Sequence, residues 1–207
     1  MMRYLLLLLT VTVLLTACGE GDPEEVKLDM SQVDTYSESD NIMAVIEIPA
    51  GTNMKYEYDE ELDEFVNDQI DGAPRKVRFL PYPGNYGFVP NTTQREDEGG
   101  DGDALDILVI SEAVPRGTAM EVVVIGALEL FDRGERDTKI IAVPADAELR
   151  TADVTDYTGL AVEMWAAKQI IEYWFLNYKG TGVTDMTGWY DEKYARALID
   201  RYRTGGE

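Results

Sequence analysis

Apolar runs and alternating apolar and polar positions in the central part of the chain predict a series of β-strands. Short segments rich in valine, isoleucine, phenylalanine and tyrosine are separated there by glycine, proline and acidic residues. The strands expected from this pattern comprise residues 43–49, 54–58, 65–66, 76–79, 105–110, 119–130 and 138–143. Gly126 predicts a bend in the longest of them, because a glycine inside a strand often marks a bulge.

Proline, glycine, asparagine and acidic residues dominate residues 80–103, and this composition predicts a long loop. Long ordered loops inside compact domains are usually functional. We therefore expect binding or catalytic side chains in this part of the chain.

The periodicity changes after residue 155, where apolar positions recur every three or four residues. This spacing predicts an amphipathic helix over residues 160–178 and a shorter helix over residues 191–202. Strands first and helices last predict an α+β domain that is mainly β. We expect a small closed antiparallel barrel with the two C-terminal helices packed outside it.

The first 17 residues have the layout of a signal peptide. A basic start at Arg3 precedes an apolar run with five consecutive leucines, and this run is too short for a comfortable membrane span. The segment Leu15-Thr16-Ala17-Cys18 resembles the lipobox of bacterial lipoproteins, in which the cysteine is lipidated. The alternative is a buried N-terminal helix with an incidental cysteine.

This resemblance divides the chain into three parts. Residues 1–17 are the expected signal peptide, and Cys18 is the expected lipidation site and membrane contact. Residues 18–40 are acidic, with glycine, proline and serine, and predict a flexible tether. Residues 41–207 form the expected domain. The predicted location is the cell envelope, as a membrane-anchored lipoprotein.

Composition restricts the chemistry of the domain. The chain has 207 residues, enough for one domain, and its net charge of −22 makes nucleic-acid binding unfavourable because phosphate backbones would be repelled. It has no histidine, which excludes a Ser-His-Asp triad, a Cys-His dyad and a zinc site built on imidazole. Carboxylates, lysine, arginine, tyrosine and metal ions remain as the available chemistry.

Three carboxylates fall within six residues directly before a predicted strand: Asp101, Asp103 and Asp106. Carboxylates this close repel one another unless cations lie between them, and hard oxygen ligands suit Mg²⁺ or Mn²⁺. An acidic surface turn is the alternative. A polar residue just inside a barrel strand needs a partner, however, and a metal ion would be one.

Other polar groups share this character. They are Glu47 with Lys55 and Glu57, Arg75 with Tyr82 and Tyr86, the turn with Asp132, Asp137 and Lys139, and the pair Tyr178-Lys179. Taken singly, the first group is also typical of a solvated strand face, the second of a packed aromatic loop and the third of a charged hairpin tip. Together they offer carboxylates for several divalent ions and donors for a polyanion, which metal-assisted phosphoryl transfer to water requires.

These segments resemble the motifs of the soluble family I inorganic pyrophosphatases. The matching segments occur in family order at residues 45–49, 55–57, 83–87, 101–106, 132–139 and 178–179. The resemblance covers about residues 41–203, nearly the whole domain. It implies a barrel of the OB type and Mg²⁺-dependent hydrolysis of pyrophosphate to two phosphates, with several ions bound and Mn²⁺ or Zn²⁺ as substitutes.

The resemblance also implies residue roles. The metal ligands would be Asp101, Asp106, Asp132, Asp137, Glu47 and Glu57. The substrate-binding residues would be Lys55, Arg75, Tyr82, Lys139, Tyr178 and Lys179, with Arg78 as an alternative to Arg75. Asp103 would be the general base, and Tyr86 would shape the surroundings of the nucleophile or hydrogen-bond phosphate.

Two positions depart from the family pattern. Ala104 stands where proline is usual, and Arg133 stands where a second acid often follows Asp132. Bacterial members are often hexamers and some use histidine at subunit contacts, so a homo-oligomer stays open here. Other hypotheses are a phosphohydrolase for nucleotides or polyphosphate, a calcium-binding surface module, and an inactive relative that only binds.

Overall fold

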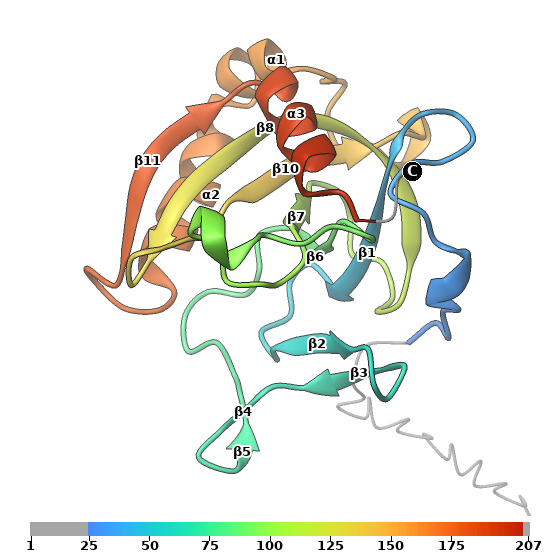
Figure 1. The fold of residues 1–207 in the computed structure, drawn as a ribbon. Helices are drawn as coiled ribbons and strands as arrows, with labels where there is room; N and C mark the ends of the chain where they lie inside the picture. The colour runs from blue at the N-terminus through green and yellow to red at the C-terminus, as the bar shows by residue number, and fades with distance from the viewer. Residues whose placement is uncertain (1–24, 205–207) are drawn as a thin grey trace, which may run out of the picture.

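A closed ring of β-strands forms the centre of the computed structural model, which describes residues 25–204 (Figure 1). Along the ring the strands follow the order β1, β6, β7, β10 and β8, and β8 pairs with β1 to close it. Their bounds are Ile42–Ile48 for β1, Asn85–Phe88 for β6, Asp106–Val109 for β7, Ala119–Asp132 for β8 and Lys139–Pro144 for β10. Two further strands, β9 (Glu135–Arg136) and β11 (Thr184–Tyr190), pair with β8. The expected OB-type barrel is confirmed.

One pairing corrects the antiparallel prediction. Strands β7 and β10 run parallel, whereas the other pairs of the ring are antiparallel. A closed ring of five strands cannot alternate in direction all the way round, so at least one neighbouring pair must be parallel. In this pair Lys139 lies opposite Asp106.

Strand β8 is long enough to take part in two halves of the structure, and it bends as predicted. Its register against β10 shifts between Gly126 and Val124. Before the bend it pairs with β1, and after the bend it pairs with β11. Strand β11 was not expected from the sequence, and neither was β6, which lies inside the predicted loop 80–103.

Two small hairpins lie below the barrel in Figure 1. Strands β2 (Tyr56–Asp59) and β3 (Glu64–Asn67) form one, and β4 (Gln69–Ile70) and β5 (Ala73–Pro74) form the other. The turn of the second hairpin consists of Asp71 and Gly72, both with positive φ, as a two-residue turn of type I′ requires. The strand expected at residues 76–79 is absent, and only Lys76 makes a bridge there, to Met54.

Within the described residues, three α-helices replace the two that were expected. The predicted helix 160–178 is divided into α1 (Tyr157–Val162) and α2 (Trp165–Asn177). The amides of Glu163 and Met164 both donate to the Gly159 carbonyl, which ends α1 and turns the chain. Helix α3 (Glu192–Tyr202) agrees with the prediction, and the Asp191 side chain caps it by accepting from the Tyr194 amide.

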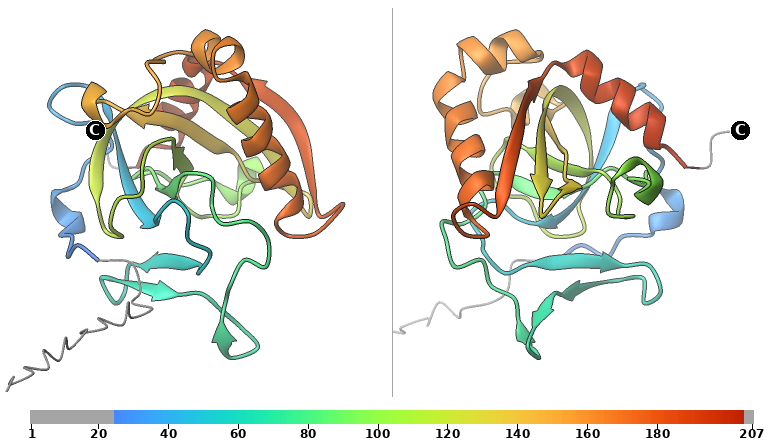
Figure 2. Two further views of the ribbon diagram at one scale, coloured as in Figure 1. Left: turned by 180° about the vertical axis from the view of Figure 1, so that it is seen from behind. Right: turned by 60° about the vertical axis from the view of Figure 1, so that its left-hand side comes forward.

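The helices cover two sides of the sheet, as Figure 2 shows. One apolar cluster packs under α3 and the other under α2. Successive strand residues point to opposite faces, so Ile107 and Val109 belong to the α3 cluster while Leu108 belongs to the α2 cluster. This double burial explains why the central strands consist of almost continuous apolar residues.

The segment before the barrel corrects the predicted tether. Residues 25–40 pack on the domain: Thr35 is buried and donates from Oγ1 to the Pro90 carbonyl, and the Asn91 side chain donates to the Val33 carbonyl. A tether that did not pack on the domain would leave these groups exposed to solvent. The expected signal peptide and Cys18 lie outside the described residues. Between residues 25 and 204, no helix is long and apolar enough to span a membrane.

Gly87 provides a test of the strand packing. A Cβ atom at this position would lie 1.8 Å from the Val45 carbonyl oxygen on β1. We expect Gly87→Ala to lower the free energy of unfolding by about 3 kcal/mol or more, since backbone must move. Urea unfolding followed by circular dichroism measures this. Gly188→Ala is the control, because its nearest atom would be 4.0 Å away, and equal losses in both variants would contradict the packing argument.

Candidate active site

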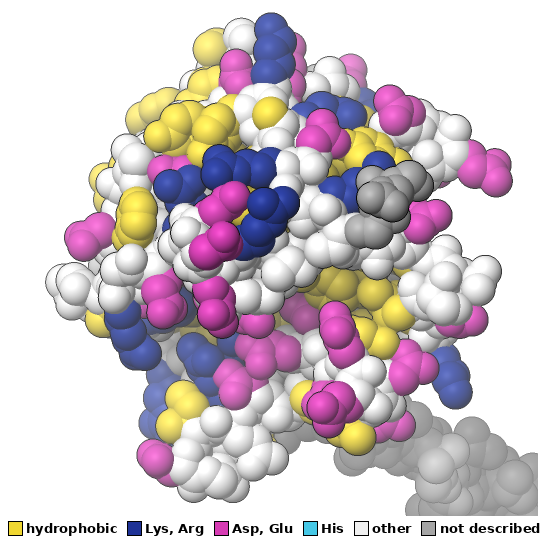
Figure 3. Space-filling view, viewed as in Figure 1, with side chains coloured by type: hydrophobic (Ala, Val, Ile, Leu, Met, Phe, Trp, Pro, Cys, Tyr) yellow, Lys and Arg dark blue, Asp and Glu magenta, His cyan; other side chains and the backbone are white. Residues whose placement is uncertain are grey.

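A polar pocket at one end of the barrel collects nearly all the side chains that the sequence singled out. Its lining residues are Glu47, Lys55, Glu57, Tyr82, Tyr86, Asp101, Asp103, Asp106, Asp132, Glu135, Asp137, Lys139, Tyr178 and Lys179. They come from distant parts of the chain, including β1, β2, β6, β7, β8, β10 and the end of α2. On the face shown in Figure 3, acidic and basic side chains are interspersed in the hollow above the β4–β5 hairpin.

Lys139 is the buried centre of the pocket. The parallel pairing of β10 with β7 places it beside Asp106, and its Nζ contacts the carboxylates of both Asp106 and Asp137. Nζ also donates to the Tyr86 hydroxyl at 3.0 Å. Burial opposes the charged form, but the two carboxylates hold the pKa of Lys139 well above its usual range. The ammonium therefore offsets the repulsion between the acids.

Lys179 extends this network from the end of α2. Its Nζ lies 2.6 Å from Asp132 Oδ2 and 3.6 Å from Asp137 Oδ2. Burial would raise the pKa of Asp137, but the charges of Lys139 and Lys179 outweigh it and lower that pKa. The other carboxylate oxygen of Asp132, Oδ1, is buried without a hydrogen-bond partner. That oxygen can still accept a cation.

Glu47 is a buried carboxyl at the wall of the pocket. It is 8 % exposed, and its Oε1 accepts a hydrogen bond from the Tyr58 amide at 2.8 Å. Burial, together with the nearby charges of Asp106 and Glu57, raises the pKa of Glu47 to about 8. The surrounding strands thus hold the Glu47 carboxyl in a buried position, where it needs a nearby positive charge to ionise.

The loop that precedes β7 presents Asp101 and Asp103. The Asp101 side chain accepts from the Asp103 amide at 3.0 Å, and Gly102 between them has a positive φ of 89°. Gln94 holds this loop through main-chain hydrogen bonds with Gly102 and Asp103. Partial burial and the charges of Asp101 and Asp106 raise the pKa of Asp103, which makes it a better proton acceptor.

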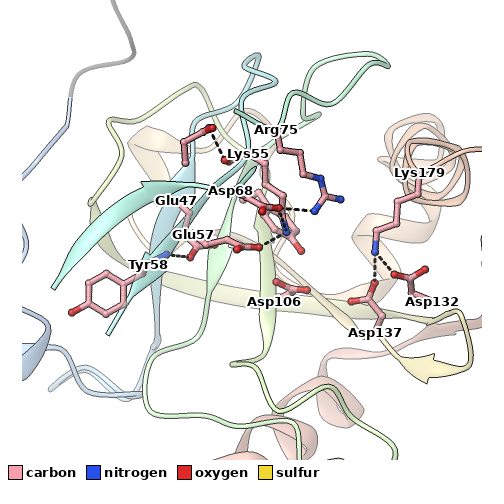
Figure 4. A network of polar contacts seen from close by, with 12 residues as sticks. Glu47, Lys55, Glu57, Tyr58, Asp68, Arg75, Asp106, Asp132, Asp137 and Lys179 are labelled. Carbon is pink, nitrogen blue, oxygen red and sulfur yellow. Dashed lines mark hydrogen bonds and ion pairs between the residues drawn. The ribbon is translucent and has the colours of Figure 1, made fainter. Parts of the chain in front are cut away.

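Arg75 lies next to the pocket without lining it (Figure 4). Its Nη1 donates to Asp68 Oδ2 at 2.7 Å, and the same oxygen lies 3.6 Å from Lys55 Nζ. Lys55 also pairs with Glu57, as the alternation of strand 54–58 predicted. Arg78 is exposed. Of the two arginines left open by the sequence, Arg75 is the one connected to this network.

The donor set fits hard divalent cations. The carboxylates offer only oxygen ligands, which suit Mg²⁺, Mn²⁺ or Ca²⁺, and the unpartnered Asp132 oxygen points to a cation nearby. Within residues 25–204 no three acids already stand around a common point. The reason is visible in the contacts, because lysine ammonium groups occupy the spaces between them.

Comparison with known proteins shows the family of the chain. The family model described as inorganic pyrophosphatase matches residues 44–204. The chain belongs to the inorganic pyrophosphatase family. It is 36% identical over 177 residues to an inorganic pyrophosphatase of Nostoc, covering 84% of this chain and 96% of the relative. A relative from Mesorhizobium japonicum is 36% identical over 190 residues, with 88% and 90% covered.

Solved structures of the family have the same fold. An inorganic pyrophosphatase from Neisseria gonorrhoeae superimposes with a TM-score of 0.68 and is 32% identical, with 84% of this chain and 96% of that chain covered. The enzyme from Thermus thermophilus gives a TM-score of 0.67 at 33% identity, with 82% and 96% covered. The match therefore includes the barrel and its helices, and residues 25–43 precede the family match.

Two residues in or beside the pocket were not found from the sequence. Glu135 lines the pocket, and Asp68 binds Arg75 and Lys55. The family motif 132–139 contained Glu135, so its position in the β8–β9 hairpin could have indicated it. Arg133, the departure from the family pattern, lies exposed in the turn of that hairpin with a φ of 53°. No local pattern marked Asp68.

Glu47 predicts a pH-dependent stability. Its pKa is about 8 in the folded chain against an ordinary 4.5, so the folded state keeps a proton that the unfolded chain releases between these values. The contribution of Glu47 to stability therefore falls as the pH rises from about 4.5 to about 8. We expect metal-free Glu47→Gln to be more stable than the wild type by about 3 kcal/mol at pH 7, with no difference near pH 4.

Denaturant unfolding in the presence of a chelator, at several pH values between 4 and 8, measures the difference between the two proteins. Other titrating groups cancel because they are common to both. A difference that stays constant over this range would contradict the buried, protonated Glu47.

Proposed function

We propose that this member of the family hydrolyses inorganic pyrophosphate to two orthophosphates, with Mg²⁺ as the cofactor. The observation that carries the proposal is the alternation of carboxylates and buried ammonium groups in one pocket. Six acids can hold cations while lysines and tyrosines face a polyanion. A net charge of −22 would otherwise repel pyrophosphate, so the bound cations also reverse the local charge.

The residues that would hold the cations are Asp101, Asp106, Asp132, Asp137, Glu47 and Glu57. When bound, divalent cations neutralise phosphate oxygens and lower the pKa of coordinated water. Mn²⁺ and Zn²⁺ are proposed as substitutes. Glu47 supports this role because it is a buried carboxyl whose ionisation needs a positive charge nearby.

Asp103 is the proposed general base. Its side chain lies at the edge of the pocket on the loop before β7, where a water molecule can approach it. The water oxygen attacks one phosphorus, its proton passes to the Asp103 carboxylate, and the bridging P–O bond breaks. The bond electrons stay with the leaving phosphate, whose charge the neighbouring lysines offset.

The phosphate oxygens would be held by residues around the pocket. Lys139, Lys179, Lys55 and Arg75 supply positive charge, and Tyr82 and Tyr178 supply phenols from the aromatic wall. Tyr86 donates to phosphate or to the attacking water and is itself fixed by Lys139. Tyr82 packs on Trp174, and Tyr178 stacks on the same ring, so both phenols are held in place.

Alternative functions have less support. A calcium-binding surface module needs a helix or a glutamate at the exit of the acidic loop, whereas strand β7 begins at Asp106. A phosphohydrolase for nucleotides or polyphosphate would need space for a long substrate outside the pocket. Inhibition of pyrophosphate hydrolysis by added polyphosphate would favour this alternative, and no inhibition would favour pyrophosphate as the substrate.

The proposed base leads to a direct test. We expect the wild type to release phosphate from pyrophosphate with Mg²⁺ and Asp103→Asn to lower kcat about a hundredfold or more. Asp97→Asn is the matched control, because Asp97 lies on the nearby exposed 3₁₀ turn and outside the pocket. A phosphate-release assay with Mg²⁺ and with Ca²⁺ measures all three proteins. No release by the wild type with any divalent metal would refute the proposal.

We also propose that the protein is a lipoprotein of the cell envelope, anchored through Cys18. The support is the signal-peptide layout and the segment Leu15-Thr16-Ala17-Cys18, which lie outside the described residues. Only six residues lie between Cys18 and Glu25, which pairs with Arg116 of the domain. Such a short connection would hold the domain within about 25 Å of the lipid surface.

The anchor is tested by fractionation. Full-length protein expressed in a bacterial host should sediment with membranes and incorporate a fatty-acid label, whereas Cys18→Ser should do neither, because it lacks the thiol that carries the lipid. Ser31→Ala, which keeps Cys18, should behave as the wild type. Wild-type protein in the soluble fraction without label would refute the anchor and leave the enzymatic proposal intact.

A further inference from the structure

Asp68 lies between Lys55 and Arg75, the two cations proposed to meet the substrate at the rim of the pocket (Figure 4). Its Oδ2 accepts a hydrogen bond from Arg75 Nη1 at 2.7 Å and lies 3.6 Å from Lys55 Nζ. The side chains of all three residues are only 20–26% exposed. One carboxylate oxygen thus contacts two partly desolvated cations.

The main chain connects the same three residues. The Lys55 amide donates to the Arg75 carbonyl at 2.9 Å, the Asp68 amide to the Lys55 carbonyl at 2.9 Å, and the Arg75 amide to the Asp68 carbonyl at 2.6 Å. Asp68 and Arg75 flank the β4–β5 hairpin, and the bond between them closes its base. The backbone determines where the two cationic side chains begin. The Asp68 carboxylate binds the end of Arg75, and Asp68 and Glu57 together bind the end of Lys55.

We propose that Asp68 is a positioning residue for pyrophosphate binding, which holds Arg75 and Lys55 at the rim of the pocket before the substrate arrives. The inference rests on the proposed function, because it concerns how the same site binds its polyanion. Neither Asp68 nor Arg75 is among the residues that line the pocket. Asp68 therefore acts through the two cations and not by contact with the reacting atoms.

Two opposing effects decide the consequence of removing this carboxylate. Long lysine and arginine side chains lose rotamer freedom when they bind a ligand, and holding them in place beforehand removes that cost. A negative charge near a polyanion also weakens binding directly. Asp71 measures this second effect alone, because it lies in the exposed turn of the same hairpin with a φ of 54°, which asparagine also tolerates.

The experiment compares kcat and KM for magnesium pyrophosphate in the wild type, Asp68→Asn and Asp71→Asn. We expect Asp68→Asn to raise KM about tenfold, the cost of ordering two side chains on binding. The kcat should change less than about threefold, because the reacting groups are untouched. Asp71→Asn should keep the wild-type KM within about twofold, since an exposed charge is screened.

A double-mutant cycle then tests whether Asp68 acts through its partners. In an Arg75→Gln background, we expect Asp68→Asn to raise KM by a smaller factor than in the wild type. If Asp68→Asn does not fold, as judged by thermal unfolding, Asp68→Glu replaces it. That variant keeps the charge but displaces it by one methylene, so a raised KM is again expected, and a wild-type KM would overturn the inference.

The outcomes separate this inference from the proposed function. A wild type that does not hydrolyse pyrophosphate overturns both. An active wild type in which Asp68→Asn and Asp71→Asn have the same KM overturns only the positioning role, because Asp68 would then act as one more surface charge. An unchanged effect of Asp68→Asn in the Arg75→Gln background also overturns it.

Discussion

The repulsion between carboxylates at one end of the barrel is the constraint on which the rest of the site depends. Asp106 and Asp137 could not lie together in a buried position without a positive charge between them. Lys139 supplies that charge from the neighbouring strand, and Lys179 adds a second from the end of α2. The protein can therefore fold with its acids assembled before any cation is bound.

Barrel closure contributes to this arrangement. Five strands in a ring require a parallel pair, and here the parallel pair consists of β7 and β10, with Asp106 opposite Lys139. The same strands are buried on both faces by α2 and α3, so their register cannot slip without exposing apolar residues. The apolar packing of the barrel thus fixes the relative positions of the charges.

Prediction from the sequence succeeded where one local pattern determined the result and failed where distant segments decided it. The strands of the ring other than β6, and helix α3, followed from apolar runs, alternation and periodicity. The apolar periodicity marked neither the break in the long helix at Met164 nor strand β11, which forms by pairing with the distant β8. Residues 25–40 have the composition of a tether, yet Thr35 is buried against Pro90.

The sequence by itself determined the chemistry. With no histidine and with acids clustered in recognisable motifs, only carboxylates, lysines, arginines and tyrosines were available, and their order along the chain indicated the pyrophosphatase family. Only the tertiary structure decided which of these groups meet. Arg75 rather than Arg78 joins Lys55 because Asp68 and the base of the β4–β5 hairpin hold it there. Contacts between residues far apart in the chain depend on closure of the barrel and on burial away from water. Both are properties of the whole fold, so the local sequence around each residue does not reveal them.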